Sequence, residues 1–182
     1  MKSLIIFGVL SLPIIIISWR TIFNVKSHGF YRFFGWEGIL WLLVSNYSFW
    51  FDNPFSIIQI ISWVLLLIGG YFVIAGVIKM KTKGKQTKER DEKALYKFER
   101  TTELIDTGIF KYIRHPLYSS LIFLTWGIFF KNPTILLLVV SILSSMFFVI
   151  TAILDEKECI AYFVDQYRDY MKRSKRFIPF IL

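Results

Sequence analysis

The sequence is poor in cysteine and in acidic residues. Its single cysteine, Cys159, excludes an intrachain disulfide and any Cys-x-x-Cys metal or redox site. No Gly-x-Gly-x-x-Gly motif occurs, which disfavours a soluble Rossmann-type cofactor domain. Thirteen acidic residues stand against 22 basic ones, and 55% of the 182 residues are apolar, more than ordinary soluble domains contain. We therefore expect a protein of the lipid bilayer, whose basic residues meet anionic lipid headgroups and not nucleic acid.

Five long apolar runs indicate how the chain crosses the bilayer. Each run is long enough, or nearly so, to cross roughly 30 Å of hydrocarbon at about 1.5 Å per helical residue. We therefore predict an all-α integral membrane fold, a single transmembrane domain over residues 1–182 with five transmembrane helices. The predicted spans are residues 4–19, 33–51, 55–78, 116–130 and 134–154.

The basic residues predict the orientation of these spans. Twenty of the 22 lie in alternate connections, at residues 20–32, 79–114 and 156–182. The positive-inside rule places these connections in the cytosol. The prediction is a multi-pass protein with its N-terminus outside and its C-terminus cytosolic. Residues 1–79 hold three N-terminal spans, and residues 80–115 form a cytosolic connection.

The cytosolic segments carry further local predictions. Residues 81–93 have no apolar period and predict a loop, and residues 94–100 predict a short helix. Residues 156–172 predict a C-terminal amphipathic helix that lies at the membrane surface. His28, in the first connection, is expected to be solvated.

Two charged pairs stand where the helix dipole opposes them. Arg114 and His115 precede Pro116, which begins the fourth span, although a helix N-terminus prefers an anion by roughly 0.3–1 kcal/mol. Asp155 and Glu156 lie at the C-terminal end of the fifth span, where a cation is preferred. Because the two spans form a hairpin, we expect both pairs at the same cytosolic end.

The lengths of these two spans predict how deep in the bilayer the charged pairs lie. The fourth span gives about 22 Å of helix and the fifth about 31 Å. With a level outer turn, His115 lies inside the cytosolic leaflet, where ionisable groups face a cavity or one another. Two interpretations remain open: a ligand site, or a plain ion pair of Arg114 with Asp155 or Glu156 that clamps the hairpin.

A sequence pattern extends beyond these pairs. Residues 104–118 read Leu-Ile-Asp-Thr-Gly-Ile-Phe-Lys-Tyr-Ile-Arg-His-Pro-Leu-Tyr, and the acidic pair is followed by Phe163, Tyr167, Tyr170 and Phe177-Ile178-Pro179. This combination resembles the isoprenylcysteine carboxyl methyltransferase family, among the integral-membrane methyltransferases that include the phospholipid N-methyltransferases. The resemblance covers residues 102–179 and implies that they form a cofactor-binding methyltransferase region.

The resemblance also implies an activity and a site. The activity is transfer of a methyl group from S-adenosylmethionine to a lipophilic or lipidated substrate in the membrane, without a metal. Arg114, His115 and Glu156 are implied as catalytic residues. The implied cofactor contacts are Thr102, Glu103, Leu104, Ile105, Phe110, His115, Pro116, Leu117, Tyr118, Asp155 and Glu156.

Three positions depart from the family's pattern. Thr151 stands where the carboxyl methyltransferases carry an arginine assigned to the substrate carboxylate, Asp155 replaces a glutamate, and Val164 replaces a glycine. The first departure weakens the case for a prenylcysteine acceptor and leaves other lipophilic acceptors open. Two other functions also remain open: an NADPH-dependent membrane reductase of the sterol-reductase type, and a non-enzymatic membrane scaffold.

Overall fold

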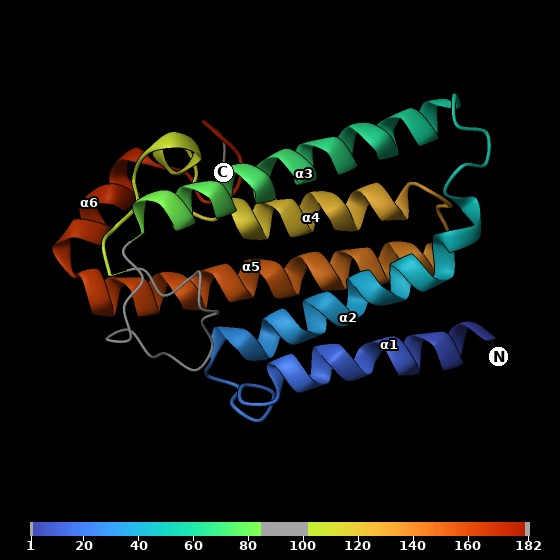
Figure 1. Cartoon of the computed structure of the whole chain (residues 1–182), viewed down its shortest axis with the longest axis horizontal. Helices are drawn as coiled ribbons and strands as arrows, with labels where there is room; N and C mark the ends of the chain where they lie inside the picture. The colour runs from blue at the N-terminus through green and yellow to red at the C-terminus, as the bar shows by residue number, and fades with distance from the viewer. Residues whose placement is uncertain (1, 85–101, 181–182) are drawn as a thin grey trace.

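The computed structural model describes residues 2–84 and 102–180, and every regular element in this part of the chain is a helix (Figure 1). The predicted short helix at residues 94–100 and most of the predicted loop at 81–93 lie outside the described residues. The elements are α1 (Lys2–Ser18), α2 (His28–Asn46), η1 (Tyr47–Phe49), α3 (Ile57–Lys83), η2 (Gly108–Lys111), α4 (Pro116–Phe129), α5 (Ile135–Phe163) and α6 (Asp165–Arg173).

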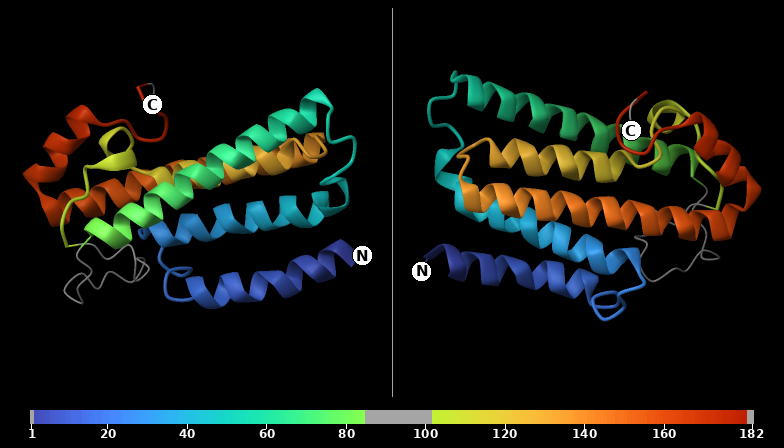
Figure 2. Two further views of the ribbon diagram at one scale, coloured as in Figure 1. Left: turned by 45° about the horizontal axis from the view of Figure 1, so that its top comes forward. Right: turned by 180° about the vertical axis from the view of Figure 1, so that it is seen from behind.

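Helices α1 to α5 lie side by side, with their axes roughly aligned (Figures 1 and 2). Helix α4 packs against α2, α3 and α5, while α1 packs on the outer side of α2. Close approach of α2 and α5 depends on Gly35, because a Cβ there would lie 2.6 Å from the ring of Phe148. Small residues at such contacts are typical of helix packing in membranes.

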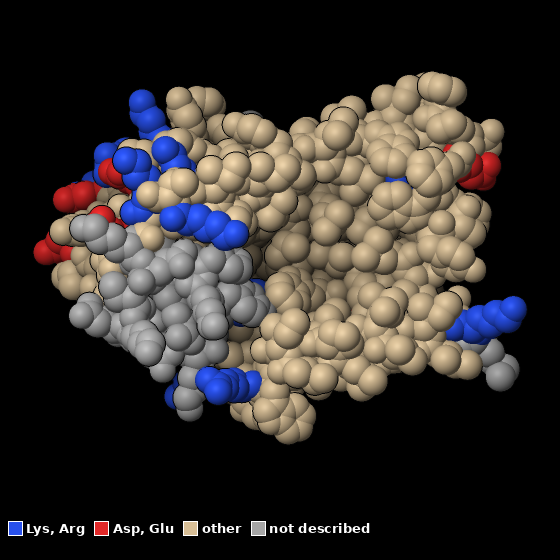
Figure 3. All heavy atoms as spheres, in the orientation of Figure 1, with Lys and Arg blue, Asp and Glu red and all other residues tan. Residues whose placement is uncertain are grey.

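The two tight turns lie at the opposite end of the bundle from α6 (Figure 1). Each contains an Asn-Pro sequence, and the helix that follows it is capped: Ser56 Oγ accepts from the Gln59 amide, and Thr134 Oγ1 from the Leu137 amide. The charged side chains of the face in Figure 3 gather mainly at the α6 end, and the middle of that face shows a broad surface without Lys, Arg, Asp or Glu.

Helices α3 and α5 are long and apolar enough to cross a membrane. The sequence predicts five spans, and by this standard the described residues contain two. Helices α1 and α4 are apolar but have only 17 and 14 residues. Helix α2 carries Arg32 and Glu37 within its 19 residues, which lowers its hydropathy.

The predicted single helix at residues 156–172 is wrong. Helix α5 continues through the acidic pair to Phe163, and the short α6 begins only at Asp165. Between them Val164 has φ 50° and ψ −121°. This left-handed conformation suits glycine and is strained for a β-branched residue. The helix is therefore broken at the position where the related family carries glycine.

We expect Val164→Gly to raise the free energy of unfolding by about 1 kcal/mol, because it relieves this backbone strain. Val164 is 51% exposed, so little packing is lost. Denaturant unfolding in detergent micelles measures the change. Val164→Ala is the matched control, since alanine keeps the unfavourable φ. Equal stabilities of the valine and glycine proteins would show that the break carries no strain.

Candidate functional site

The start of α4 is held by the C-terminal tail of the chain. The Arg114 amide donates to the Lys175 carbonyl at 2.8 Å, the Lys175 amide to the Tyr112 carbonyl at 2.9 Å, and the His115 amide to the Arg176 carbonyl at 3.1 Å. Pro116 then occupies the first helical turn, where its missing N–H costs nothing. These contacts fix the backbone from which Arg114 and His115 project.

Glu156 accepts hydrogen bonds from two arginines that come from different parts of the chain. Arg114 Nε lies 2.8 Å from Glu156 Oε1, and Arg176 Nη2 lies 2.7 Å from Oε2. Arg114 also donates to the carbonyl of Ser174. The Glu156 side chain is 5% exposed, so this carboxylate is buried but saturated by cations. It ties α4, α5 and the C-terminal tail together.

His115 lies between the two acids. Its Nε2 is 3.3 Å from Glu156 Oε1, and its Nδ1 is 3.6 Å from Asp155 Oδ2. The imidazole is 5% exposed and packs against the rings of Tyr118 and Phe177. The structure thus brings Arg114 and His115 together with Asp155 and Glu156, as the hairpin argument predicts, and forms the predicted ion pair as well.

A cavity of about 100 Å³, partly open to solvent, adjoins this cluster. The wall is mainly apolar and aromatic, and its polar members include Arg114, His115 and Asp155. The lining residues are Met80, Leu104, Ile105, Phe110, Arg114, His115, Pro116, Leu117, Tyr118, Asp155, Cys159, Phe163, Tyr167 and Tyr170.

Helix α6 closes one side of the cavity. Tyr170 is 2% exposed and donates its hydroxyl to the Phe110 carbonyl at 2.6 Å, which joins α6 to η2. Burial raises the pKa of Tyr170, so its phenol remains a donor at neutral pH. Gly108, at the start of η2, has φ 65° and lies against the side chain of Lys79. Only glycine adopts this conformation readily at such a contact.

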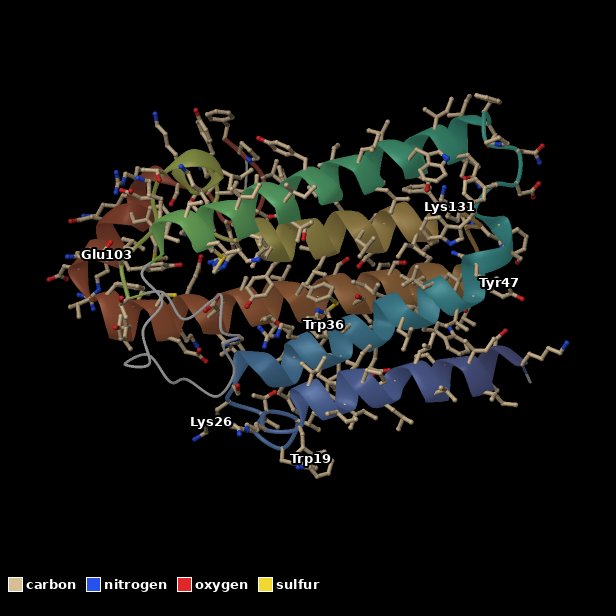
Figure 4. The ribbon with its side chains drawn as sticks, viewed as in Figure 1. Trp19, Lys26, Trp36, Tyr47, Glu103 and Lys131 are labelled. Carbon is tan, nitrogen blue, oxygen red and sulfur yellow. The ribbon has the colours of Figure 1, made fainter. Side chains whose placement is uncertain are left out.

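Most of the residues predicted to contact the cofactor line this cavity, and three do not. Glu156 points into the arginine cluster behind the wall. Thr102 and Glu103 are not among the lining residues, and Glu103 lies at the α6 end of the bundle (Figure 4). The predicted set therefore divides into a wall that contains Asp155 and His115 and a clamp centred on Glu156.

Sequence reasoning missed Arg176 and misplaced His28. Arg176 lies 20 residues beyond Glu156 in a segment rich in basic residues, and no pattern distinguishes it from its neighbours. The prediction that His28 is solvated is wrong, because its side chain is 0% exposed and its Nδ1 lies 2.7 Å from Glu158 Oε2. His28 begins α2 and packs against α5 near the acidic pair.

The arrangement defines a helical protein with two helices long and apolar enough to cross a membrane and with a partly open cavity at the charged end of its bundle. Residues 57–163 match the phospholipid methyltransferase family, and the chain belongs to this family. The match runs from α3 to the end of α5 and includes both charged pairs. It confirms the resemblance to integral-membrane methyltransferases. Comparison with curated proteins gave no match, and comparison with solved structures gave none.

The cavity wall suits the chemistry of S-adenosylmethionine. Its aromatic and aliphatic side chains suit an adenine ring, and the Asp155 carboxylate suits an ammonium group. The Leu117 amide lies in the first turn of α4, where a helix N-terminus favours an anion, and with His115 it suits a carboxylate. Arg114 is already engaged by Glu156 and Ser174, so it contributes positive charge more than direct contact.

Proposed function

We propose that this protein transfers a methyl group from S-adenosylmethionine to a lipophilic acceptor in the membrane. The observation that carries the proposal is the cavity wall that joins Asp155 and His115 to an aromatic slot, in a member of a methyltransferase family. Bound S-adenosylmethionine supplies an electrophilic methyl group on a positively charged sulfur. The protein's own residues have to bind the cofactor, orient its methyl group toward the acceptor and exclude water from the site.

Asp155 and Glu156 have different roles in this proposal. Asp155 lies in the wall and binds the positively charged portion of the cofactor, while His115 holds Asp155 from α4. Glu156 keeps Arg114 and the C-terminal tail in place and accepts no proton, because its oxygens already accept from both arginines. We therefore assign Glu156 a positioning role in place of the predicted catalytic one.

The acceptor is better described as neutral or amine-bearing than as a carboxylate. Thr151 is 0% exposed and donates its hydroxyl to the Phe147 carbonyl at 2.7 Å, within its own helix. It therefore offers no cationic group to a substrate carboxylate. An amine acceptor needs a base to remove its proton, and the His115 imidazole in the cavity wall is the group we assign to this role.

We also propose how the helices lie in the membrane. Helices α1 to α5 all cross the bilayer, with the short α4 placing His115 inside the cytosolic leaflet and α6 at its surface. The gathering of charged groups at the α6 end supports this orientation (Figure 3). The basic residues there contact anionic headgroups, and the acceptor enters from the bilayer.

Incubation of purified protein with methyl-labelled S-adenosylmethionine and a lipid extract from the source membranes tests this function. We expect one lipid fraction to acquire the label, and Asp155→Asn to reduce the initial rate by about tenfold or more. Lys157→Ala, an exposed neighbour, serves as the control and should retain the wild-type rate. Failure of the wild-type protein to label any lipid would contradict the proposal.

A further inference from the structure

His28 forms a second contact to the acidic end of α5, from the side opposite α4. Its imidazole is 0% exposed, although it stands only two residues beyond the exposed Lys26. Its Nδ1 lies 2.7 Å from Glu158 Oε2. Ligand-forming atoms of His28, Asp155 and Glu158 all lie within 4.8 Å of one another. The Asp155 carboxylate is therefore close to two imidazoles, His28 from α2 and His115 from α4.

The charges around Asp155 explain why an imidazole is needed there. Asp155 and Glu158 are three residues apart on α5 and so share a face of the helix, where like charges repel. The neighbouring Glu156 is already neutralised by Arg114 and Arg176. His28 lies near both remaining carboxylates and offsets their repulsion, which favours an ordered Asp155.

The geometry suits a histidine oriented by a carboxylate better than it suits a metal ion. Nδ1 is already paired with Glu158, as in a carboxylate-oriented imidazole. A histidine that binds a metal through one nitrogen normally donates from the other to a partner. Here the buried Nε2 has no hydrogen-bond partner among residues 2–84 and 102–180. A metal held by Nδ1 together with Asp155 and Glu158 would therefore lack the hydrogen bond at Nε2 that normally fixes a ligand imidazole.

We propose that His28 is a positioning residue for the cofactor-binding carboxylate: held by Glu158, it fixes Asp155 in the cavity wall. This inference rests on the proposed function, because it gives Asp155 the task of binding S-adenosylmethionine. It adds that α2, which lies outside the family match and contributes no cavity-lining residue, controls cofactor affinity through α5.

A double-mutant cycle on the full-length chain in detergent tests the proposal, with the dissociation constant for labelled S-adenosylmethionine as the measured quantity. We expect His28→Ala to weaken binding about tenfold in the wild-type background. In the Asp155→Asn background the same change should weaken binding by less than about twofold, because its target is already removed. Saturating cofactor should restore most of the turnover rate in His28→Ala, since the defect lies in binding.

Controls separate this role from folding and from other functions of His28. Lys26→Ala, whose side chain points away from the bundle (Figure 4), should leave affinity unchanged. Glu158→Gln alters the partly exposed partner and should weaken binding in the same direction, which keeps the test available if His28→Ala does not fold. His28→Asn, which offers an amide N–H in place of Nδ1–H, should recover part of the affinity.

Several results would overturn the inference. Additive effects in the cycle would show that His28 does not act through Asp155. A fall in turnover rate with unchanged affinity would make it a base for the acceptor, and loss of binding on addition of EDTA would indicate a metal site. Absence of S-adenosylmethionine binding in the wild-type protein would overturn the proposed function itself, and this inference with it.

Discussion

Replacement of Glu156 by alanine is expected to lower the free energy of unfolding by about 3–5 kcal/mol, because it leaves Arg114 buried without its counter-charge. The Glu156 side chain is 5% exposed and Arg114 is 8% exposed, so water cannot replace the lost contacts. Arg176 loses its partner as well. Denaturant unfolding in detergent micelles measures the difference.

Lys157→Ala provides the matched control for this prediction. Lys157 is the exposed neighbour of Glu156 on α5, and its replacement should change the free energy of unfolding by less than about 0.5 kcal/mol. An unchanged stability for Glu156→Ala would mean that the arginine cluster does not hold the C-terminal tail against α4 and α5.

Replacement of the adjacent Asp155 by asparagine is expected to weaken cofactor binding and to leave the fold intact. We expect the affinity for S-adenosylmethionine to fall about 10- to 100-fold. Asp155 lines the cavity and is 16% exposed, whereas Glu156 lies behind the wall. Consecutive residues project about 100° apart around a helix, so the two acids serve different partners.

Equilibrium binding of labelled cofactor to the purified variants measures this second effect. Lys157→Ala is the control, because Lys157 is exposed on the same turn of α5. If Asp155→Asn binds S-adenosylmethionine as tightly as the wild-type protein does, the cofactor's positive charge is held elsewhere. If Asp155→Asn instead loses stability as Glu156→Ala does, Asp155 belongs to the clamp.

Local physical signals in the sequence predict the helical segments and the meeting of the charged pairs. The apolar runs give α4 within one residue at either end, since Pro116 begins the helix and Lys131-Asn132-Pro133 ends it. The unfavourable placement of Arg114, His115, Asp155 and Glu156 against their helix dipoles indicates their mutual contact, because a hairpin brings those ends together.

The parts that sequence reasoning missed depend on contacts between distant segments. The end of the apolar run near residue 154 predicts the end of the span, but α5 continues to Phe163 because its last turns pack against α6. Arg176 reaches Glu156 only because the tail pairs with residues 112–115. His28 is buried only because the start of α2 packs on α5. No periodicity or spacing in a single chain encodes these three contacts.

Equilibrium binding of S-adenosylmethionine to the purified wild-type protein most directly tests the claim that the two charged pairs frame a cofactor site. We predict saturable binding at one site per chain, accompanied by a higher midpoint of thermal unfolding, because a ligand that binds only the folded state stabilises it. Absence of saturable binding, or tight binding of NADPH in its place, would contradict the account.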